Sequence, residues 1–166
     1  YILGFQSYAS HDSGACIIKF DNTNKFLDYV SISEDRLVRR KHTYEFPTHS
    51  IYECMKYFNL KGLNEISYVY SDWIKEPKWF RSGPGYNYQM YDYLKEKFKF
   101  DKNKIIQLNH HLCHAASTYY SSGFKKSAVL IIDGLGSDNE THSIYKAKDY
   151  KIKFLERYKH RGIGGL

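Results

Sequence analysis

Three short apolar segments alternate with polar connections at the start of the chain. Residues 1–5 (YILGF), 15–20 (ACIIKF) and 26–33 (FLDYVSIS) are rich in apolar and β-branched residues. Runs of this length bounded by polar clusters predict β-strands. The connections SYASHDSG and DNTNK are short, and both carry the Asp, Asn and Ser residues typical of turns. The pattern predicts a three-stranded antiparallel meander.

Helical and strand patterns alternate in the middle of the chain. An amphipathic helix of about three turns is predicted after FPTHS, with Thr48 or Ser50 as its cap. Its apolar face is formed by Ile51, Met55 and Phe58. Residues 66–71 and 105–108 predict buried strands, and a helix is expected over 86–98 between them.

The last third continues with one helix and three strands. The stretch HHLCHAASTYYSS predicts a helix that ends before Gly123, a residue typical of helix C-termini. Residues 127–134, 141–148 and 150–158 then predict strands. The order βββαβαβα, followed by these strands, predicts an α/β fold with a mixed sheet.

The C-terminal strands repeat the organisation of the N-terminus: strand, polar loop with Asp, strand, turn, strand. The two hairpins, YILGFQSYASHDSGACIIKF and VLIIDGLGSDNETHSIYKAK, indicate an internal duplication. This arrangement resembles proteins of the actin, sugar-kinase and Hsp70 type, which pair two ribonuclease-H-like lobes. The resemblance implies one lobe over residues 1–126 and the truncated opening of a second over residues 127–166.

Composition narrows the class of protein. The 25 Lys and Arg against 18 Asp and Glu give a net charge of +7. One run of basic residues comprises Arg36, Arg39, Arg40, Lys41 and His42. It could bind nucleic acid or a phosphorylated ligand, or it could be the solvated edge of a helix. Three distant cysteines imply no disulfide framework. With no long apolar span or signal-peptide pattern, we expect a soluble cytoplasmic protein without membrane contact. Because the chain starts with Tyr and stops at RGIGGL, we expect it to be a fragment.

The stretch NHHLCHAAS places several histidines where a predicted strand ends and a predicted helix begins. His110 and His114 are four residues apart, so on a helix they share one face and can bind one ion. Asp133 ends an apolar strand and would add a carboxylate, giving an N/N/O set that suits iron, zinc or manganese. His111 lies about 100° round the helix and could meet an anion at its N-terminus. The alternative is that these histidines are caps or surface residues.

Two loops offer donors for an oxyanion. Gly134 and Gly136 would let backbone N–H groups approach a phosphate, although DGLG could equally be an ordinary turn. The first loop gathers His11, Asp12 and Ser13 at a strand end, where a plain Asx-turn would also use Asp12 and Ser13.

Taken together, these motifs resemble one family. The segments ILGFQSYASHDSGACIIKF, SEDRLVRRKHTYEFPTHSI, NHHLCHAASTYYSSGF and AVLIIDGLG are similar to the N-terminal, Kae1-like region of NodU/TobZ-type O-carbamoyltransferases. Members carry HHLxHAAS and IDGxG at matching spacing over nearly the whole chain. The chain departs from the common pattern at Gly14, where Ser is usual, and at Cys113, where Ala is usual.

The resemblance implies a carbamoyl transfer. Full-length members use carbamoyl phosphate and ATP to make carbamoyl-adenylate in a YrdC-like domain. The Kae1-like domain moves the carbamoyl group to a hydroxyl of a sugar or antibiotic-like acceptor. This chain would need the rest of its own polypeptide, including the YrdC-like domain, so we expect no turnover from it alone; a homodimer is possible.

The resemblance also implies residue roles. His110, His114 and Asp133 match the family's metal ligands, whose further partner is a later Asp outside this chain. His11 matches a residue that binds the carbamoyl intermediate or acts in catalysis, and a histidine or aspartate near the acceptor hydroxyl, His11 or Asp133, would take its proton. Lys41 would neutralise phosphate and His111 would touch the nucleotide phosphate.

Three other functions stay open at this point. A sugar kinase of the same architecture would need an acidic base and no HxxxH pair. A Kae1-like subunit of tRNA threonylcarbamoylation would share the histidines but carry a different first loop. A non-enzymatic module that binds nucleic acid or a protein partner through RLVRRKH would show salt-sensitive binding and no metal; we expect nucleic acid not to be the partner.

Overall fold

The computed structural model describes residues 1–6, 12–43, 45–72, 96 and 98–159. The chain divides into two compact units, residues 1–107 and residues 108–166. The division falls before the helix of the HHLCHAAS segment, which packs on the strands that follow it; the lobe boundary expected after residue 126 stays a prediction.

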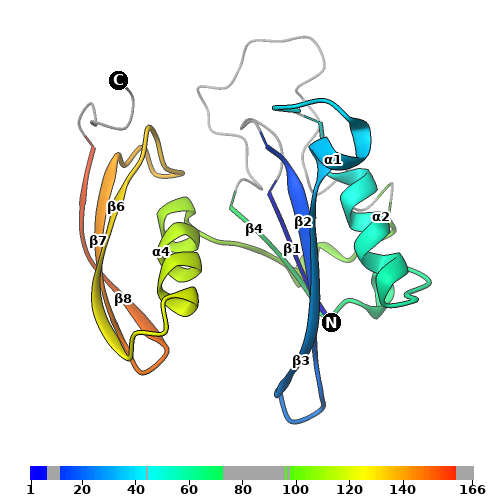
Figure 1. The fold of residues 1–166 in the computed structure, drawn as a ribbon, viewed down its shortest axis with the longest axis horizontal. Coiled ribbons are helices and arrows are strands. Elements are labelled where there is room, and N and C mark those ends of the chain that lie inside the picture. Colours follow the sequence, from blue (N-terminus) through cyan, green and yellow to red (C-terminus); the bar gives the residue numbers. More distant parts are fainter. Residues whose placement is uncertain (7–11, 44, 73–95, 97, 160–166) are drawn as a thin grey trace. The chain divides into compact units, whose positions relative to one another are not determined.

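The first unit is built on a five-stranded mixed sheet (Figure 1). Its spatial order is β3-β2-β1-β4-β5, with β1, β2 and β3 antiparallel and β4 and β5 parallel to β1. The strands are β1 (Ile2–Gln6), β2 (Gly14–Phe20), β3 (Phe26–Ser33), β4 (Tyr68–Ser71) and β5 (Ile105–Gln107). A meander extended by two parallel strands is the ribonuclease-H-like order, which confirms the predicted fold class and the mixed sheet.

Helix α2 (Thr48–Tyr57) closes the core of this unit. Ile51 and Cys54 are fully buried, and they pack with Leu3 and Ile17 from the two central antiparallel strands. Further helical elements are α1 (Glu34–Val38) and the 3₁₀ turns η1 (Leu63–Glu65) and η2 (Lys102–Lys104). The sequence pattern missed α1, which contains the first arginine of the basic run. Most of the helix predicted over 86–98 lies outside the described residues.

The second unit packs one helix on a three-stranded antiparallel sheet. Helix α4 (His110–Ser121) precedes β6 (Lys126–Ile132), β7 (His142–Lys148) and β8 (Lys151–Tyr158), which lie in the order β6-β7-β8. Ala115 and Tyr119 of the helix are buried against Val129 and Ile131 of β6. Gly123 follows the helix with φ of 74°, a left-handed conformation that glycine adopts without strain.

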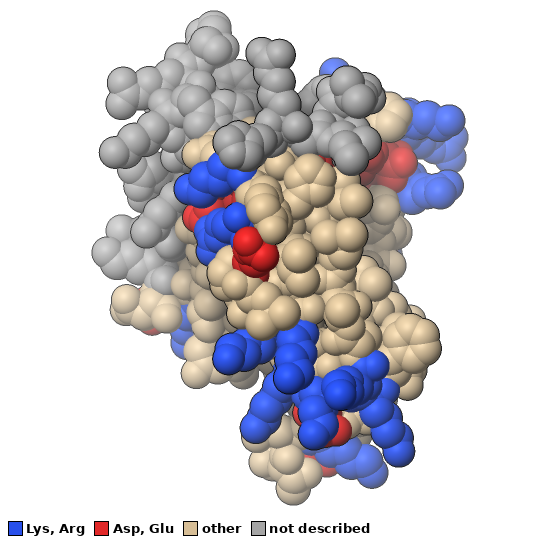
Figure 2. Space-filling view, turned by 90° about the vertical axis from the view of Figure 1, so that its left-hand side faces the viewer, with Lys and Arg blue, Asp and Glu red and all other residues tan. Residues whose placement is uncertain are grey.

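Lysines gather on one part of the β6-β7-β8 sheet. The register places Lys126 opposite Lys148, Lys148 opposite Lys151, and Lys146 opposite Lys153. Cross-strand partners point to the same face, so five exposed lysines share it, and Figure 2 shows lysines and arginines crowded at the lower end of this side of the molecule. None of the helices in the described part of the chain is long and apolar enough to cross a membrane.

Candidate metal centre

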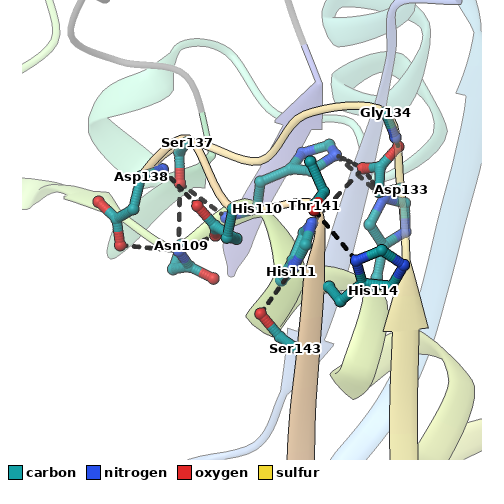
Figure 3. Close-up of polar contacts among 12 residues, drawn as sticks. Asn109, His110, His111, His114, Asp133, Gly134, Ser137, Asp138, Thr141 and Ser143 are labelled. Atoms are coloured by element: carbon teal, nitrogen blue, oxygen red, sulfur yellow. Dashed lines mark hydrogen bonds and ion pairs between the residues drawn. The ribbon is translucent and has the colours of Figure 1, made fainter. Parts of the chain in front are cut away.

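The three predicted ligands converge in the second unit (Figure 3). His110 Nε2 lies 2.8 Å from Asp133 Oδ2 and 3.0 Å from His114 Nε2. His114 Nε2 lies 3.4 Å from the same Asp133 oxygen. Two imidazole nitrogens and one carboxylate oxygen therefore point at one spot. One atom from each residue can be chosen so that all lie within 4.8 Å of one another, the arrangement needed to hold an ion.

Local structure explains this convergence. His110 and His114 occupy the first and second turns of α4, where residues four apart lie one above the other. Asp133 directly follows β6, the strand on which α4 packs through Ala115 and Tyr119. The packing that buries the helix thus brings the end of the strand beside the histidine face.

The Asp133 carboxylate is held ionised by its surroundings. Partial burial acts to raise its pKa, but the Gly134 N–H, at 2.6 Å from Oδ1, and the nearby imidazole of His110 outweigh burial and lower it. The carboxylate is about three-tenths exposed, so a bound ion would keep access to solvent and to further ligands.

His111 points away from the helix N-terminus into the protein. Its side chain is fully buried, Nδ1 lies 2.7 Å from Ser143 Oγ on β7, and burial lowers its pKa. Nε2 lies 3.9 Å from Asp133 Oδ2 and makes no hydrogen bond in the described part of the structure. The interior position follows from its place about 100° round the helix from His110, facing the sheet. The expected phosphate contact would therefore require this side chain to be uncovered.

The glycine amides expected to meet phosphate already have partners. Gly134 N–H donates to its neighbour Asp133, and Gly136 N–H donates to the carbonyl oxygen of Glu140 at 2.7 Å. Gly136 also stands where a side chain would not fit, because a Cβ there would lie 2.5 Å from Glu140 Cδ. A role in phosphate binding stays a prediction that requires these bonds to open.

The candidates of the first loop and the basic run lie in the first unit. His11 lies outside the described residues. Asp12 Oδ1 lies 3.2 Å from His42 Nδ1, and Lys41 is exposed. Ser13 is fully buried, and its hydroxyl has no hydrogen-bond partner in the described structure.

Sequence reasoning missed three residues that organise these elements. Glu34, fully buried, accepts hydrogen bonds from Ser50 N and Ser50 Oγ at the start of α2. Asn109 caps α4, and its amide contacts Glu140, which is 1% exposed. Asn before a helical segment is a readable capping signal, whereas nothing in the sequence marks Glu34 or Glu140 as buried.

Comparisons with known proteins agree with the motifs. The family model described as carbamoyltransferase N-terminus matches residues 58–165. The nodulation protein NolNO of Sinorhizobium fredii is 27% identical over 93% of this chain, and an uncharacterised Synechocystis protein, sll1178, is 25% identical over 82% of it. Each alignment covers 26% of the relative, so the chain matches about a quarter of their length.

Two further likenesses cover less or are weaker. The uncharacterised protein MJ1058 of Methanocaldococcus jannaschii is 41% identical over 37% of this chain and 10% of its own length. The solved structure of YeaZ from Pseudomonas aeruginosa is similar to 93% of this chain with a TM-score of 0.49 at 10% identity, over 64% of that structure. Since the family model covers well over half of the residues, the chain belongs to the carbamoyltransferase N-terminus family.

Proposed function

We propose that the chain is part of an O-carbamoyltransferase that transfers a carbamoyl group from carbamoyl-adenylate to a hydroxyl of a sugar or antibiotic-like acceptor. In this proposal carbamoyl phosphate and ATP are the substrates from which the adenylate is made. The His110, His114 and Asp133 cluster carries the proposal, because family membership gives the reaction class and the cluster offers a place for its chemistry.

The residues of the cluster fit a divalent metal ion. Metal–ligand bonds of about 2.1 Å imply ligand separations of roughly 3.0 Å at octahedral edges and 3.4 Å at tetrahedral edges. The three separations of 2.8, 3.0 and 3.4 Å lie close to these values. The mixed nitrogen and oxygen set suits iron, zinc or manganese. When bound, the ion would act as a Lewis acid on a carbonyl or phosphate oxygen.

The side chains have distinct tasks in this proposal. His110, His114 and Asp133 hold the ion, and the lowered pKa of Asp133 keeps its carboxylate charged for this purpose. The Lys41 ammonium group, which is exposed, neutralises phosphate charge. His11 binds the carbamoyl group or accepts the proton of the acceptor hydroxyl.

Metal content and carbamoyl transfer test the proposal. The complete polypeptide would be purified with and without the substitutions His110→Ala and His114→Ala. His142→Ala is the matched control, because His142 lies near by on β7 outside the cluster, with Nδ1 3.0 Å from Thr141 Oγ1. We expect about one transition metal per chain in the wild type and the control, and loss of metal and of label transfer from carbamoyl phosphate in both cluster variants. Full transfer by metal-free His110→Ala would overturn the metal's role.

A further inference from the structure

One side chain joins the two segments that carry the metal ligands. Asn109 Oδ1 accepts from Leu112 N at 2.9 Å and so caps α4, the helix of His110 and His114. Asn109 Nδ2 donates to Glu140 Oε1 at 2.7 Å and to Asp138 Oδ2 at 3.1 Å, in the loop that begins at Asp133. Figure 3 shows Asn109 between the helix start and Asp138.

Glu140 accepts hydrogen bonds from other residues of this loop. Its side chain is almost fully buried, Oε2 accepts from Asp138 N at 2.6 Å, and its carbonyl oxygen accepts from Gly136 N at 2.7 Å. The missing side chain of Gly136 leaves the space that this carboxylate fills. A buried carboxylate is costly unless it is hydrogen-bonded, and the partners of Glu140 come from this loop and from Asn109.

A second contact ties the loop to a metal-ligating residue. Ser137 Oγ accepts from the backbone N–H of His110 at 3.0 Å. The loop from Asp133 to Glu140 is therefore hydrogen-bonded to the start of α4 at two residues, Asn109 and His110. One of them is the first histidine of the cluster, and the other directly precedes it.

We propose that the Asn109–Glu140 pair is a positioning device that sets the metal affinity of the cluster, an inference that rests on the proposed function. Neither residue offers a ligand atom to the cluster, so the pair acts through His110 and Asp133. Without it, ion binding would have to order the loop and align it with the helix, which costs conformational entropy. Outer partners of metal ligands typically change metal affinity about 10- to 100-fold.

The test separates positioning from capping. Asn109→Ser keeps a side-chain oxygen for the helix cap but lacks the amide that reaches Glu140, and serine caps helices about as well as asparagine. Glu140→Gln keeps the size of the side chain and removes its charge. Asn139→Gly is the matched control, because Asn139 lies in the same loop with φ of 62°, which glycine also adopts.

Co²⁺ affinity of the complete polypeptide is the first measurement, with the melting temperature beside it. We expect Kd to rise roughly 10- to 100-fold for Asn109→Ser and Glu140→Gln and to stay within threefold of wild type for the control. The double variant should lose less than the sum of the two, because glutamine offers one oxygen to the two donors Asn109 Nδ2 and Asp138 N, so both substitutions act on the same group of contacts. Equal Co²⁺ affinity in wild type and both variants would overturn the positioning role while leaving the metal site intact.

Amide hydrogen exchange in the metal-free polypeptide is the second measurement. We expect residues 134–139 to exchange at least about tenfold faster in both variants than in the control. If the wild type binds no Co²⁺, the proposed metal site is wrong, and the exchange rates of the loop amides then decide whether the Asn109–Glu140 pair still orders the loop. Exchange at control rates in both variants would show that the pair does not order the loop.

Discussion

Replacing Glu34 by glutamine tests whether a distant buried carboxylate caps α2. The helix begins at Thr48 after Pro47, which makes no side-chain cap; Thr48 N donates to Phe46 O, but the next two N–H groups need another acceptor. Glu34 supplies it: Oε1 accepts from His49 N at 3.1 Å and lies 2.6 Å from His49 Nδ1, and Oε2 accepts from Ser50 N at 2.7 Å and from Ser50 Oγ at 2.6 Å.

The expected cost follows from these contacts. Glutamine has one acceptor oxygen, so either the His49 N–H or the Ser50 N–H must face an amide NH₂ group. An unsatisfied buried donor costs about 1–3 kcal/mol, and the remaining bonds lose their charge assistance. We expect Glu34→Gln to reduce the free energy of opening α2 by about 2–3 kcal/mol, more than the ~1 kcal/mol of an ordinary cap.

Cys54 reports this opening directly. Its thiol is fully buried on α2, so labelling requires the helix to detach. A loss of 2–3 kcal/mol corresponds to labelling about 30- to 150-fold faster at neutral pH. Glu53→Gln is the control, since this residue pairs with Lys56 at 3.5 Å on the exposed side of the same helix. Labelling of Glu34→Gln within threefold of wild type would refute the capping argument.

Lowering the pH tests independently whether the ionised Glu34 stabilises α2, because protonation of Glu34 should destabilise the helix. Burial acts to raise the pKa of Glu34, but the hydrogen bonds from Ser50 and His49 outweigh it and lower the pKa below its usual 4.5. A group whose pKa is lowered on folding stabilises above its unfolded value and loses this contribution as pH falls through the folded pKa. Cys54 labelling by a pyridyl disulfide should therefore accelerate below pH 4.5 in the wild type, and Glu34→Gln should lack this part of the acceleration.

The remaining predictions concern both units. Gly136→Ala should weaken Co²⁺ binding about as much as Asn109→Ser, because the added Cβ displaces Glu140; unchanged affinity would contradict the crowding seen there. Ala115→Leu overfills the contact between α4 and β6 and should cost about 1–3 kcal/mol in thermal unfolding; an unchanged melting temperature would contradict this. Burial raises the pKa of Cys54 to about 11, so roughly one thiol in a thousand is ionised at pH 8, and iodoacetamide should modify the half-buried Cys113 before Cys54, as peptide mass spectrometry can show. Lys126→Glu replaces its like-charge cross-strand pair with Lys148 by an opposite-charge pair and should raise the melting temperature, with a smaller gain in 1 M salt.

Elements fixed by local pattern were predictable from the sequence. The strand expected over 26–33 is β3 with the same bounds, and the Asp-Tyr turn between β7 and β8 puts Asp149 and Tyr150 at positive φ, as a tight hairpin requires. Both meanders, β1-β2-β3 and β6-β7-β8, follow from short connections between apolar runs. The packing of α4 on β6 did not follow, because which sheet a helix packs on is a tertiary choice.

The cap of α2 was not predictable by the same means. Thr48 and Ser50 are good capping residues, and the sequence offered either of them. The structure instead uses Glu34, which lies 16 residues before Ser50 in a five-residue helix too short to show a period. The segment SISEDR looks like an ordinary polar surface, so burial of its first acidic residue becomes visible only once β3 and α2 lie side by side.

In the candidate metal site, too, the ligands were predictable from the sequence, whereas the residues that position them were not. His110 and His114 have the spacing of residues on one helix face, and Asp133 stands at the end of an apolar strand. Each candidate ligand can therefore be predicted from the local sequence pattern. Asn109 and Glu140 are 31 residues apart, and their contact depends on a loop that folds back over the helix start. A related chain with the same histidines and aspartate but without this pair would need another tie between loop and helix. Ligand motifs alone therefore predict where an ion can bind, whereas the affinity of the site depends on side chains that no ligand motif contains.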